Sequence, residues 1–177
     1  MCSLESFKID LKGLDEGVRV LEYHLVDDYF EAIDAPEVRS GDLHVNVSVR
    51  KTADLYELEF RTEGTVAVPC DLCLDDMEQR IEAKDRLLVR LGNEYSEEDD
   101  VVIVDENEGI LDTSWIIYEF IALAIPIKHV HAPGKCNPAM IEALEGLSTD
   151  RSSDEESTKP VDPRWSELEK LKTIIKD

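Results

Sequence analysis

Cys70 and Cys73, two cysteines separated by two residues, are the side chains whose type and spacing most directly indicate chemistry in this chain. Two thiolates in a tight turn can hold one metal ion, and a tetrahedral site then needs two more ligands from elsewhere in the sequence. Cys136 and one of two nearby histidines can supply these ligands. We therefore predict a structural zinc site formed by Cys70, Cys73, Cys136 and His131, with His129 as the alternative imidazole.

Other interpretations of these cysteines stay open at this point. The thiols can be small buried hydrophobic groups without any ligand. Cys70 and Cys73 can also form a redox dithiol, although such pairs prefer the start of a helix in a βαβ unit. A nucleophilic dyad of Cys136 with His131 is a third alternative. By contrast, zinc held by three thiolates and one imidazole has no open coordination position, so it would stabilise the fold and perform no catalysis.

Motifs of catalysis are absent from the rest of the sequence. It contains no Gly-x-Ser-x-Gly elbow, no His-Glu-x-x-His motif and no glycine-rich phosphate loop. Five carboxylates between residues 94 and 100 lack the spacing of a calcium loop, which favours a solvated acidic loop. His24 and His44 lie on predicted strands and are assigned to the surface, and Cys2 is given no role. We expect a protein that is not an enzyme and has no small-molecule substrate.

Hydrophobic periodicity predicts the elements that must position the cysteines. Residues 43–49 alternate between apolar and polar side chains, which is typical of a strand. Residues 55–68 continue as a strand with a bulge or bend at Gly64, and residues 77–91 form another, so the cysteine pair lies at the tip of a hairpin. Further strands are predicted at 7–11, 18–26 and 101–104, and short helices at 29–33 and 140–147. A helix from Trp115 to about Ala124 is predicted, with Ile116, Phe120, Leu123 and Ala124 on one apolar face.

The order of these elements predicts an α+β fold. We expect a mainly antiparallel β-sheet, curved or barrel-like, with one core helix after the last strand, in a single domain of residues 1–147. Residues 148–163 are rich in Ser, Thr, Pro and acids, which is typical of a disordered linker. Residues 164–177 are predicted to form an amphipathic helix that docks on its own domain or on a partner.

Charge and hydropathy restrict the class of protein further. A formal charge of −22 argues against direct RNA binding through a basic patch. The first ten residues lack the basic and apolar regions of a signal peptide, and no stretch approaches the roughly 18 apolar residues of a spanning helix. We therefore expect a cytoplasmic protein without membrane association, where cysteines stay reduced.

Three motifs resemble the YceD family, the large ribosomal RNA subunit accumulation proteins. The first is the strand that ends in Cys70-Asp71-Leu72-Cys73, and the second is Leu123-Ala124-Ile125-Pro126 followed by His131 and Cys136. The third is Asp162-Pro163-Arg164-Trp165, which leads into the terminal helix. Many members carry a second close cysteine cluster after the proline, whereas this chain has one cysteine there and His131.

The resemblance implies a non-enzymatic role in biogenesis of the large ribosomal subunit, supporting accumulation or processing of its large rRNA through protein contacts. It also implies a basic large-subunit ribosomal protein or a pre-ribosomal particle as partner, and complementary charge makes an acidic protein suitable for that contact. The alternative function is a thiol-dependent redox or metal-sensing protein that uses Cys70 and Cys73.

Overall fold

The computed structural model describes residues 3–15, 17–53, 55–92 and 101–147 of the chain. The acidic loop, the linker and the C-terminal helix predicted from the sequence lie outside these residues and stay predictions. Contacts between residues divide the chain into two compact units, Met1–Glu142 and Ala143–Asp177. The sheet and the predicted metal ligands all belong to the first unit.

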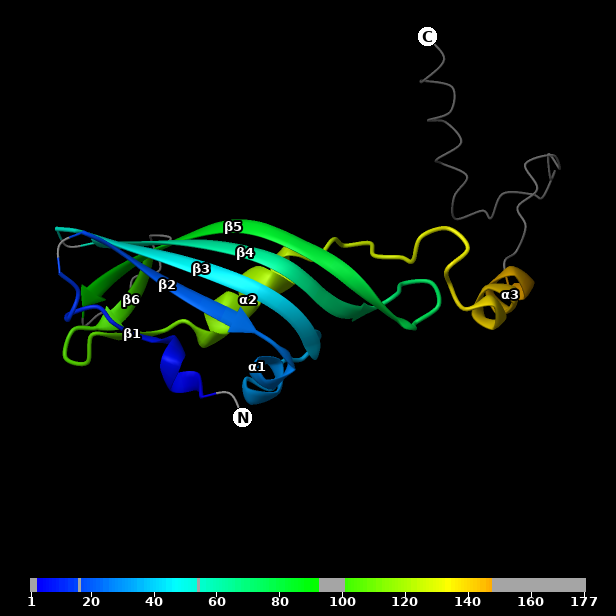
Figure 1. Cartoon of the computed structure of the whole chain (residues 1–177), viewed down its shortest axis with the longest axis horizontal. Helices are drawn as coiled ribbons and strands as arrows, with labels where there is room; N and C mark the ends of the chain where they lie inside the picture. The colour runs from blue at the N-terminus through cyan, green and yellow to red at the C-terminus, as the bar shows by residue number, and fades with distance from the viewer. Residues whose placement is uncertain (1–2, 16, 54, 93–100, 148–177) are drawn as a thin grey trace, which may run out of the picture. The chain divides into compact units, whose positions relative to one another are not determined.

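Five strands form one open sheet in the order β2-β3-β4-β5-β6 (Figure 1). Their bounds are β2 (Val18–Leu25), β3 (Ser40–Thr52), β4 (Leu55–Pro69), β5 (Asp76–Gly92) and β6 (Val101–Asp105). Neighbouring strands are antiparallel except for β5 and β6, which are parallel. The predicted α+β class is confirmed, but the barrel-like form is not supported, because β2 and β6 remain at opposite edges of the sheet.

One face of the sheet forms the hydrophobic core. On β3, the side chains of Leu43, Val45, Val47 and Val49 are at most 1% exposed, while the residues between them face the other side. This alternation is the period of an extended strand with one buried face. The cover consists of α1 (Asp27–Ala32), α2 (Ser114–Ala124) and a second, two-stranded sheet of β1 (Lys8–Asp10) and β7 (Ile110–Asp112). The hydroxyl of Tyr29 in α1 donates to the carbonyl of Ser114 in α2 at 2.7 Å and joins two of these elements.

The helix α2 buries a different face from the one predicted. Its buried residues are Ser114, Ile117, Tyr118 and Ile121. Of the predicted set, Ile116, Phe120 and Ala124 pack only partly against the core, and Leu123 is 80% exposed. The prediction was wrong because apolar residues occur nearly all around this helix, so their spacing alone does not fix which face turns inward.

Strand β4 continues through Gly64 without the predicted bulge. Gly64 pairs with Leu43, and the register between β3 and β4 is uninterrupted on both sides of this pair. The glycine has a φ of +151°, and a Cβ added there would lie 2.1 Å from the carbonyl oxygen of Asp42. Glycine therefore allows β3 to approach closely while β4 keeps its pairing.

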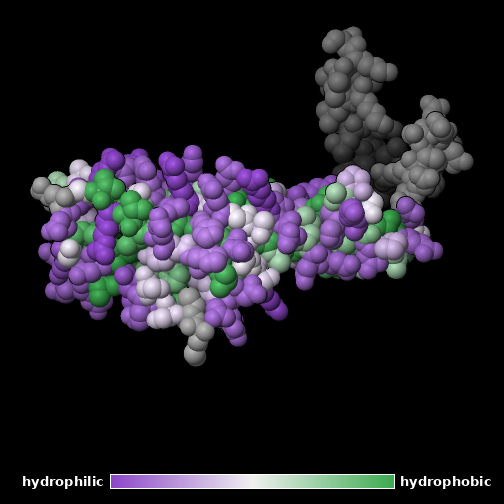
Figure 2. Space-filling view, viewed as in Figure 1, coloured by the Kyte–Doolittle hydropathy of each residue, from purple (hydrophilic) through white to green (hydrophobic). Residues whose placement is uncertain are grey.

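Hydrophilic residues predominate on the face shown in Figure 2. The helix α3 (Pro138–Leu147) has no buried residue. Within the described part of the chain, none of the helices combines the length and the apolar character needed to cross a bilayer.

Candidate metal centre

The turn between β4 and β5 presents the cysteine pair. The strands end their pairing at Pro69 and Asp76. The backbone N–H of Cys70 then donates to the carbonyl of Asp75 at 2.9 Å, and the N–H of Leu74 donates to the carbonyl of Cys70 at 2.9 Å. Leu74 has a φ of +63°, which completes the reversal of the chain. This turn leaves Cys70 and Cys73 only 0% and 1% exposed, although it lies at the tip of a hairpin.

The loop after α2 supplies the other two side chains. The helix ends at Ala124, and Pro126 prevents its continuation. Further along, the N–H of Lys135 donates to the carbonyl of Ala132 at 2.9 Å, and Gly134 has a φ of +77°. This second turn brings Cys136 back beside His131.

The four side chains predicted as zinc ligands lie together. The ligand atoms of Cys70, Cys73, His131 and Cys136 are all within 4.8 Å of one another. The sulfurs of Cys70 and Cys136 are 3.9 Å apart, and Nδ1 of His131 is 3.3 Å from the sulfur of Cys73 and 3.9 Å from that of Cys136. All three cysteines are free thiols. Residues separated by about 60 positions in the chain therefore form one compact donor set.

These distances fit a tetrahedral ion of the size of zinc. With Zn–S bonds of about 2.3 Å and Zn–N bonds of about 2.0 Å, two sulfurs lie about 3.8 Å apart, and a sulfur and a nitrogen about 3.5 Å apart. The cluster shows values close to both separations. Three thiols and an imidazole are also soft donors of the kind that zinc prefers over magnesium or calcium. The arrangement is compatible with a metal site that has four protein ligands.

Hydrogen bonds and neighbouring sulfurs shift the pKa values of Cys70 and Cys136 in opposite directions. Burial by itself would raise the pKa of Cys70, but N–H groups of Cys73, His131 and Leu72 and the imidazole of His131 donate to its sulfur, so the pKa falls to about 6. Burial and the neighbouring sulfurs of Cys70 and Cys73 instead raise the pKa of Cys136 to about 11. A divalent cation among the sulfurs would remove this repulsion and favour all three thiolates.

His129, the alternative imidazole ligand, contacts Pro126 and Asp71. Its Nδ1 lies 3.0 Å from the carbonyl oxygen of Pro126, and its Nε2 lies 3.6 Å from a carboxylate oxygen of Asp71. The backbone N–H of His129 also donates to this carboxylate at 2.8 Å. His129 therefore braces the loop against the turn, and His131 is the histidine that reaches the sulfurs.

Two contacts that hold the site together were not predicted from the sequence. Asp71 lies between the cysteines and binds the backbone of His129, and the side-chain amide of Asn137 donates to Asp75 at 3.2 Å. Both pairs join the turn between β4 and β5 to the segment that follows α2. Only the local pattern Cys-Asp-x-Cys could have suggested Asp71, because an Asp in a turn often accepts backbone hydrogen bonds.

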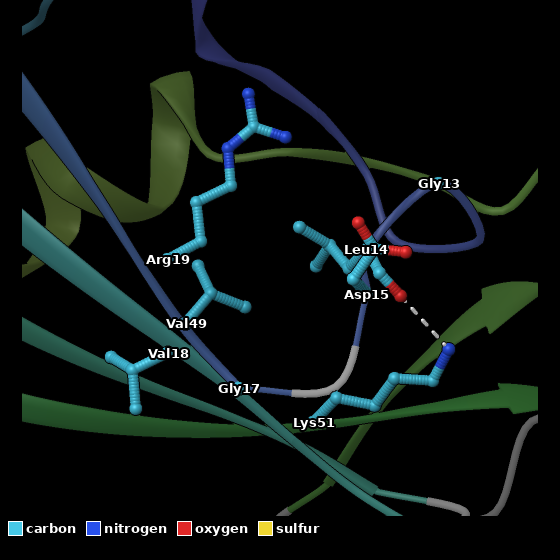
Figure 3. Close-up of a pocket in the computed structure, with 8 residues that line it drawn as sticks. All are labelled: Gly13, Leu14, Asp15, Gly17, Val18, Arg19, Val49 and Lys51. Atoms are coloured by element: carbon cyan, nitrogen blue, oxygen red, sulfur yellow. Dashed lines mark hydrogen bonds between the residues drawn. The ribbon is translucent and has the colours of Figure 1, made fainter.

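A separate hollow lies at the other end of the sheet, where β2 begins and β3 ends (Figure 3). Its volume is about 180 Å³, and its cationic lining residues are Arg19 and Lys51. The ammonium group of Lys51 donates to the carbonyl of Leu14 at 3.1 Å, as drawn in Figure 3, and lies over the ring of Tyr56. Ligand pockets usually measure about 300–1,000 Å³. This hollow is smaller, and Lys51 holds the chain segment before β2.

Comparison with known proteins adds one finding. No curated protein and no solved structure matches the chain. The family profile described as "Large ribosomal RNA subunit accumulation protein YceD" matches residues 58–172, a range that begins in β4 and includes the whole cysteine and histidine cluster. Because this match covers more than half of the chain, the protein belongs to the YceD family.

Proposed function

We propose that this protein is a non-enzymatic factor in biogenesis of the large ribosomal subunit and supports accumulation or processing of the large-subunit rRNA. The family match over residues 58–172 carries this proposal, because the family's description names accumulation of the large ribosomal RNA subunit. The protein acts through contacts with a basic large-subunit ribosomal protein or with a pre-ribosomal particle. It has no small-molecule substrate.

A structural zinc ion bound by Cys70, Cys73, His131 and Cys136 is part of this proposal. The four donor atoms lie within 4.8 Å of one another and come from two segments far apart in the sequence. An ion with four protein ligands has no open position for a substrate, so its contribution is to stability. It fixes the β4–β5 turn to the loop after α2 and thereby keeps the end of the sheet in one shape.

The net charge supports protein contacts over direct RNA contacts. A chain with a formal charge of −22 repels the phosphate backbone and attracts basic proteins. Complementary charges of this kind raise the association rate and exclude wrong partners, and salt weakens them. We therefore propose that the protein reaches rRNA by way of a basic ribosomal protein.

An acidic hollow beside α1 is our proposed contact for basic side chains of that partner. It has a volume of about 640 Å³. The charged groups of its wall are three carboxylates and one guanidinium, so its net charge is negative; they belong to Asp27, Glu31, Asp34 and Arg39. Phe30 and Pro36 contribute apolar surface. Asp27 already accepts a hydrogen bond from the backbone N–H of Gly41 at 3.1 Å. The exposed carboxylates of Glu31 and Asp34 remain on the rim to attract a Lys or Arg side chain.

The alternative function, redox or metal sensing through Cys70 and Cys73, has less support. A reactive thiol must be accessible as well as deprotonated. The lowered pKa of Cys70 would favour reaction, but Cys70 and Cys73 are 0% and 1% exposed. They also lie in a turn between antiparallel strands, and not at the start of a helix. Hydrogen bonds from backbone N–H groups and from His131 account for the lowered pKa of Cys70, and a buried thiolate is suited to metal ligation more than to reaction with a substrate.

A deletion strain tests the proposed function directly. We expect less large-subunit rRNA and a lower ratio of large to small subunits on sucrose gradients, and the wild-type gene on a plasmid should restore both. Normal rRNA levels and normal subunit ratios in the deletion strain would contradict the proposal.

The contact surface is tested by charge reversal at the hollow. We expect the double variant Glu31→Lys/Asp34→Lys to capture less basic ribosomal protein from purified large-subunit proteins than the wild type, and the difference should shrink at high salt. Glu78→Lys/Glu82→Lys on β5 is the matched control, because it changes the charge equally on the exposed face of the sheet. An equal loss in both variants would point to net charge alone and remove the hollow from the proposal.

A further inference from the structure

A second group of metal-ligating side chains lies on the sheet and shares no residue with the cysteine cluster. It consists of His24 on β2 and Asp42 and His44 on β3. Their ligand atoms are all within 4.8 Å of one another. The family match begins at residue 58, so this group also lies outside the matched range.

The strand register brings the three residues together. Strands β2 and β3 are antiparallel, and His24 is directly opposite His44. Asp42 precedes His44 by two residues and therefore points to the same face. Leu43 and Val45, which alternate with them, are 0% and 1% exposed in the core. The two imidazoles and the carboxylate consequently project from the exposed face of the sheet.

The contacts within the group are close. Nε2 of His24 lies 2.8 Å from a carboxylate oxygen of Asp42. The rings of His24 and His44 are nearly parallel, with an interplanar angle of 5° and centroids 4.5 Å apart. The two imidazole rings are therefore stacked on each other, and the carboxylate of Asp42 lies beside the ring of His24.

The donor set selects the class of ion. Two imidazole nitrogens and one carboxylate oxygen suit Zn²⁺, Cu²⁺ or Ni²⁺, whereas Mg²⁺ and Ca²⁺ prefer oxygen ligands alone. Metal–ligand bonds of about 2.0–2.1 Å would bring these donors about 3.3 Å apart. Side-chain rotation can provide this contraction, because the side chains of His24 and Asp42 are 54% and 68% exposed.

The surroundings favour a cation. Glu63 on β4 is directly opposite His44, and Glu82 on β5 is directly opposite Glu63. Both glutamates are exposed, and Glu82 has a cationic neighbour, Arg80, at 3.6 Å. Residues directly opposite each other in a sheet have Cβ atoms about 5 Å apart, so the carboxylate of Glu63 is within reach of an ion held by His44.

We propose that His24, Asp42 and His44 form a second metal site, which reversibly binds a divalent transition-metal ion of the Zn²⁺ class. Three protein ligands leave a coordination position open to water or to Glu63. The site has no thiolate and lies on the surface, so it binds zinc more weakly than the cysteine cluster and exchanges it faster.

Zinc titration of the full-length protein tests this proposal. Binding is measured by calorimetry in excess magnesium chloride. The magnesium ions occupy ordinary carboxylate clusters, so the zinc binding that remains depends on imidazole or thiolate ligands. We expect a zinc-binding event in addition to any event at the cysteine cluster, and we expect His24→Gln and His44→Gln each to abolish it. Long-range proton–nitrogen spectra should show shifts of the His24 and His44 ring nitrogens in the same range of zinc concentration.

Glu22→Gln is the matched control, because Glu22 is exposed on β2 two residues before His24 and on the same face. This variant lowers the local negative charge and keeps the three ligands, so the second event should remain. Absence of that event in the wild type, its persistence in both histidine variants, or its loss in Glu22→Gln would overturn the proposal. The two sites share no residue, so we expect Cys73→Ser to keep zinc binding at His24, Asp42 and His44. If zinc does not bind the cysteine cluster, that result contradicts only the zinc site in the proposed function.

Discussion

The backbone N–H of His129 donates to the carboxylate of Asp71 at 2.8 Å, and the N–H of Asp71 donates back to the carbonyl of His129 at 3.0 Å. This reciprocal pair joins the β4–β5 turn to the loop after α2 without using a sulfur. The backbone N–H of His131 then reaches the sulfur of Cys70 at 3.4 Å. The donor set is therefore positioned by hydrogen bonds of the protein, which lowers the cost of organising it around an ion.

Replacing Asp71 by Ala should loosen this connection. We expect a loss of about 1 kcal/mol in the free energy of unfolding, at the lower end for a hydrogen bond to a charged group because the side chain is 39% exposed. Zinc affinity should fall as well. Urea unfolding measures the first effect and competition with a chelator measures the second. Asp76→Ala, also exposed and near the turn, should change neither quantity; equal effects of both substitutions would contradict the role given to Asp71.

Replacing Cys73 by Ser should remove most of the stabilisation that comes from metal. Because metal binding and formation of the site are coupled, we expect a loss of several kcal/mol relative to the zinc-loaded wild type. Thermal unfolding with and without a chelator provides the measurement. The chelator should lower the Tm of the wild type towards that of the variant, while the variant itself should not respond.

Cys2→Ser is the control for Cys73→Ser, because Cys2 is the cysteine outside the predicted ligand set. It should keep the zinc content and the chelator response of the wild type. Elemental analysis of the purified wild type adds a direct check. A zinc content far below one per chain, together with a Tm that ignores the chelator, would contradict the structural metal site.

Two glycines, one just before β2 and one within β4, allow the cost of backbone strain to be measured separately from the cost of a steric clash. Gly64 and Gly17 have similar φ values of +151° and +138°. A Cβ at Gly64 would lie 2.1 Å from the carbonyl oxygen of Asp42, whereas a Cβ at Gly17 would meet nothing within 4 Å. We expect Gly17→Ala to cost about 1–3 kcal/mol from strain alone and Gly64→Ala to cost clearly more. Similar unfolding free energies for the two variants would contradict this prediction, because they would mean that β3 can move away from a side chain at position 64 at little cost.

Much of the fold could be predicted because burial and strand period agree. Leu43, Val45, Val47 and Val49 alternate with polar residues, and the structure places all four in the core. The position of the cysteine pair at a hairpin tip followed from the long alternating segments on both sides. Of the bulge or bend predicted at Gly64, the bulge is absent, because the register there is uninterrupted. The glycine instead allows β3 to approach closely. The sequence of a single strand cannot show such an approach.

The site illustrates the same limit. The residue types and spacing predicted that Cys70, Cys73 and Cys136 would lie together, and the structure places them together. Which of His129 and His131 lies beside them depends on the direction in which the loop turns each imidazole. The pairing of His24 with His44 depended on the register between β2 and β3. Register arises from long-range pairing of whole strands, so no local pattern around either histidine indicates that they meet.

Asp85 should make stability depend on pH. It lies on the inward-facing side of β5 opposite Phe60, and its Oδ2 is buried without a hydrogen-bond partner among the described residues. Burial raises the pKa of Asp85. The folded state therefore prefers the protonated carboxyl. The stability that protonated Asp85 provides is fully present below the ordinary Asp pKa of about 4, and it is lost as pH rises through the higher pKa of the folded state.

We expect Asp85→Asn to have a higher Tm than the wild type at pH 7, where the wild-type carboxyl is charged. Near pH 3 the wild-type carboxyl is protonated, so the two Tm values should be similar. Glu78→Gln, exposed on the same strand, should show no such dependence, and an equal Tm gain at both pH values would contradict the assignment to Asp85.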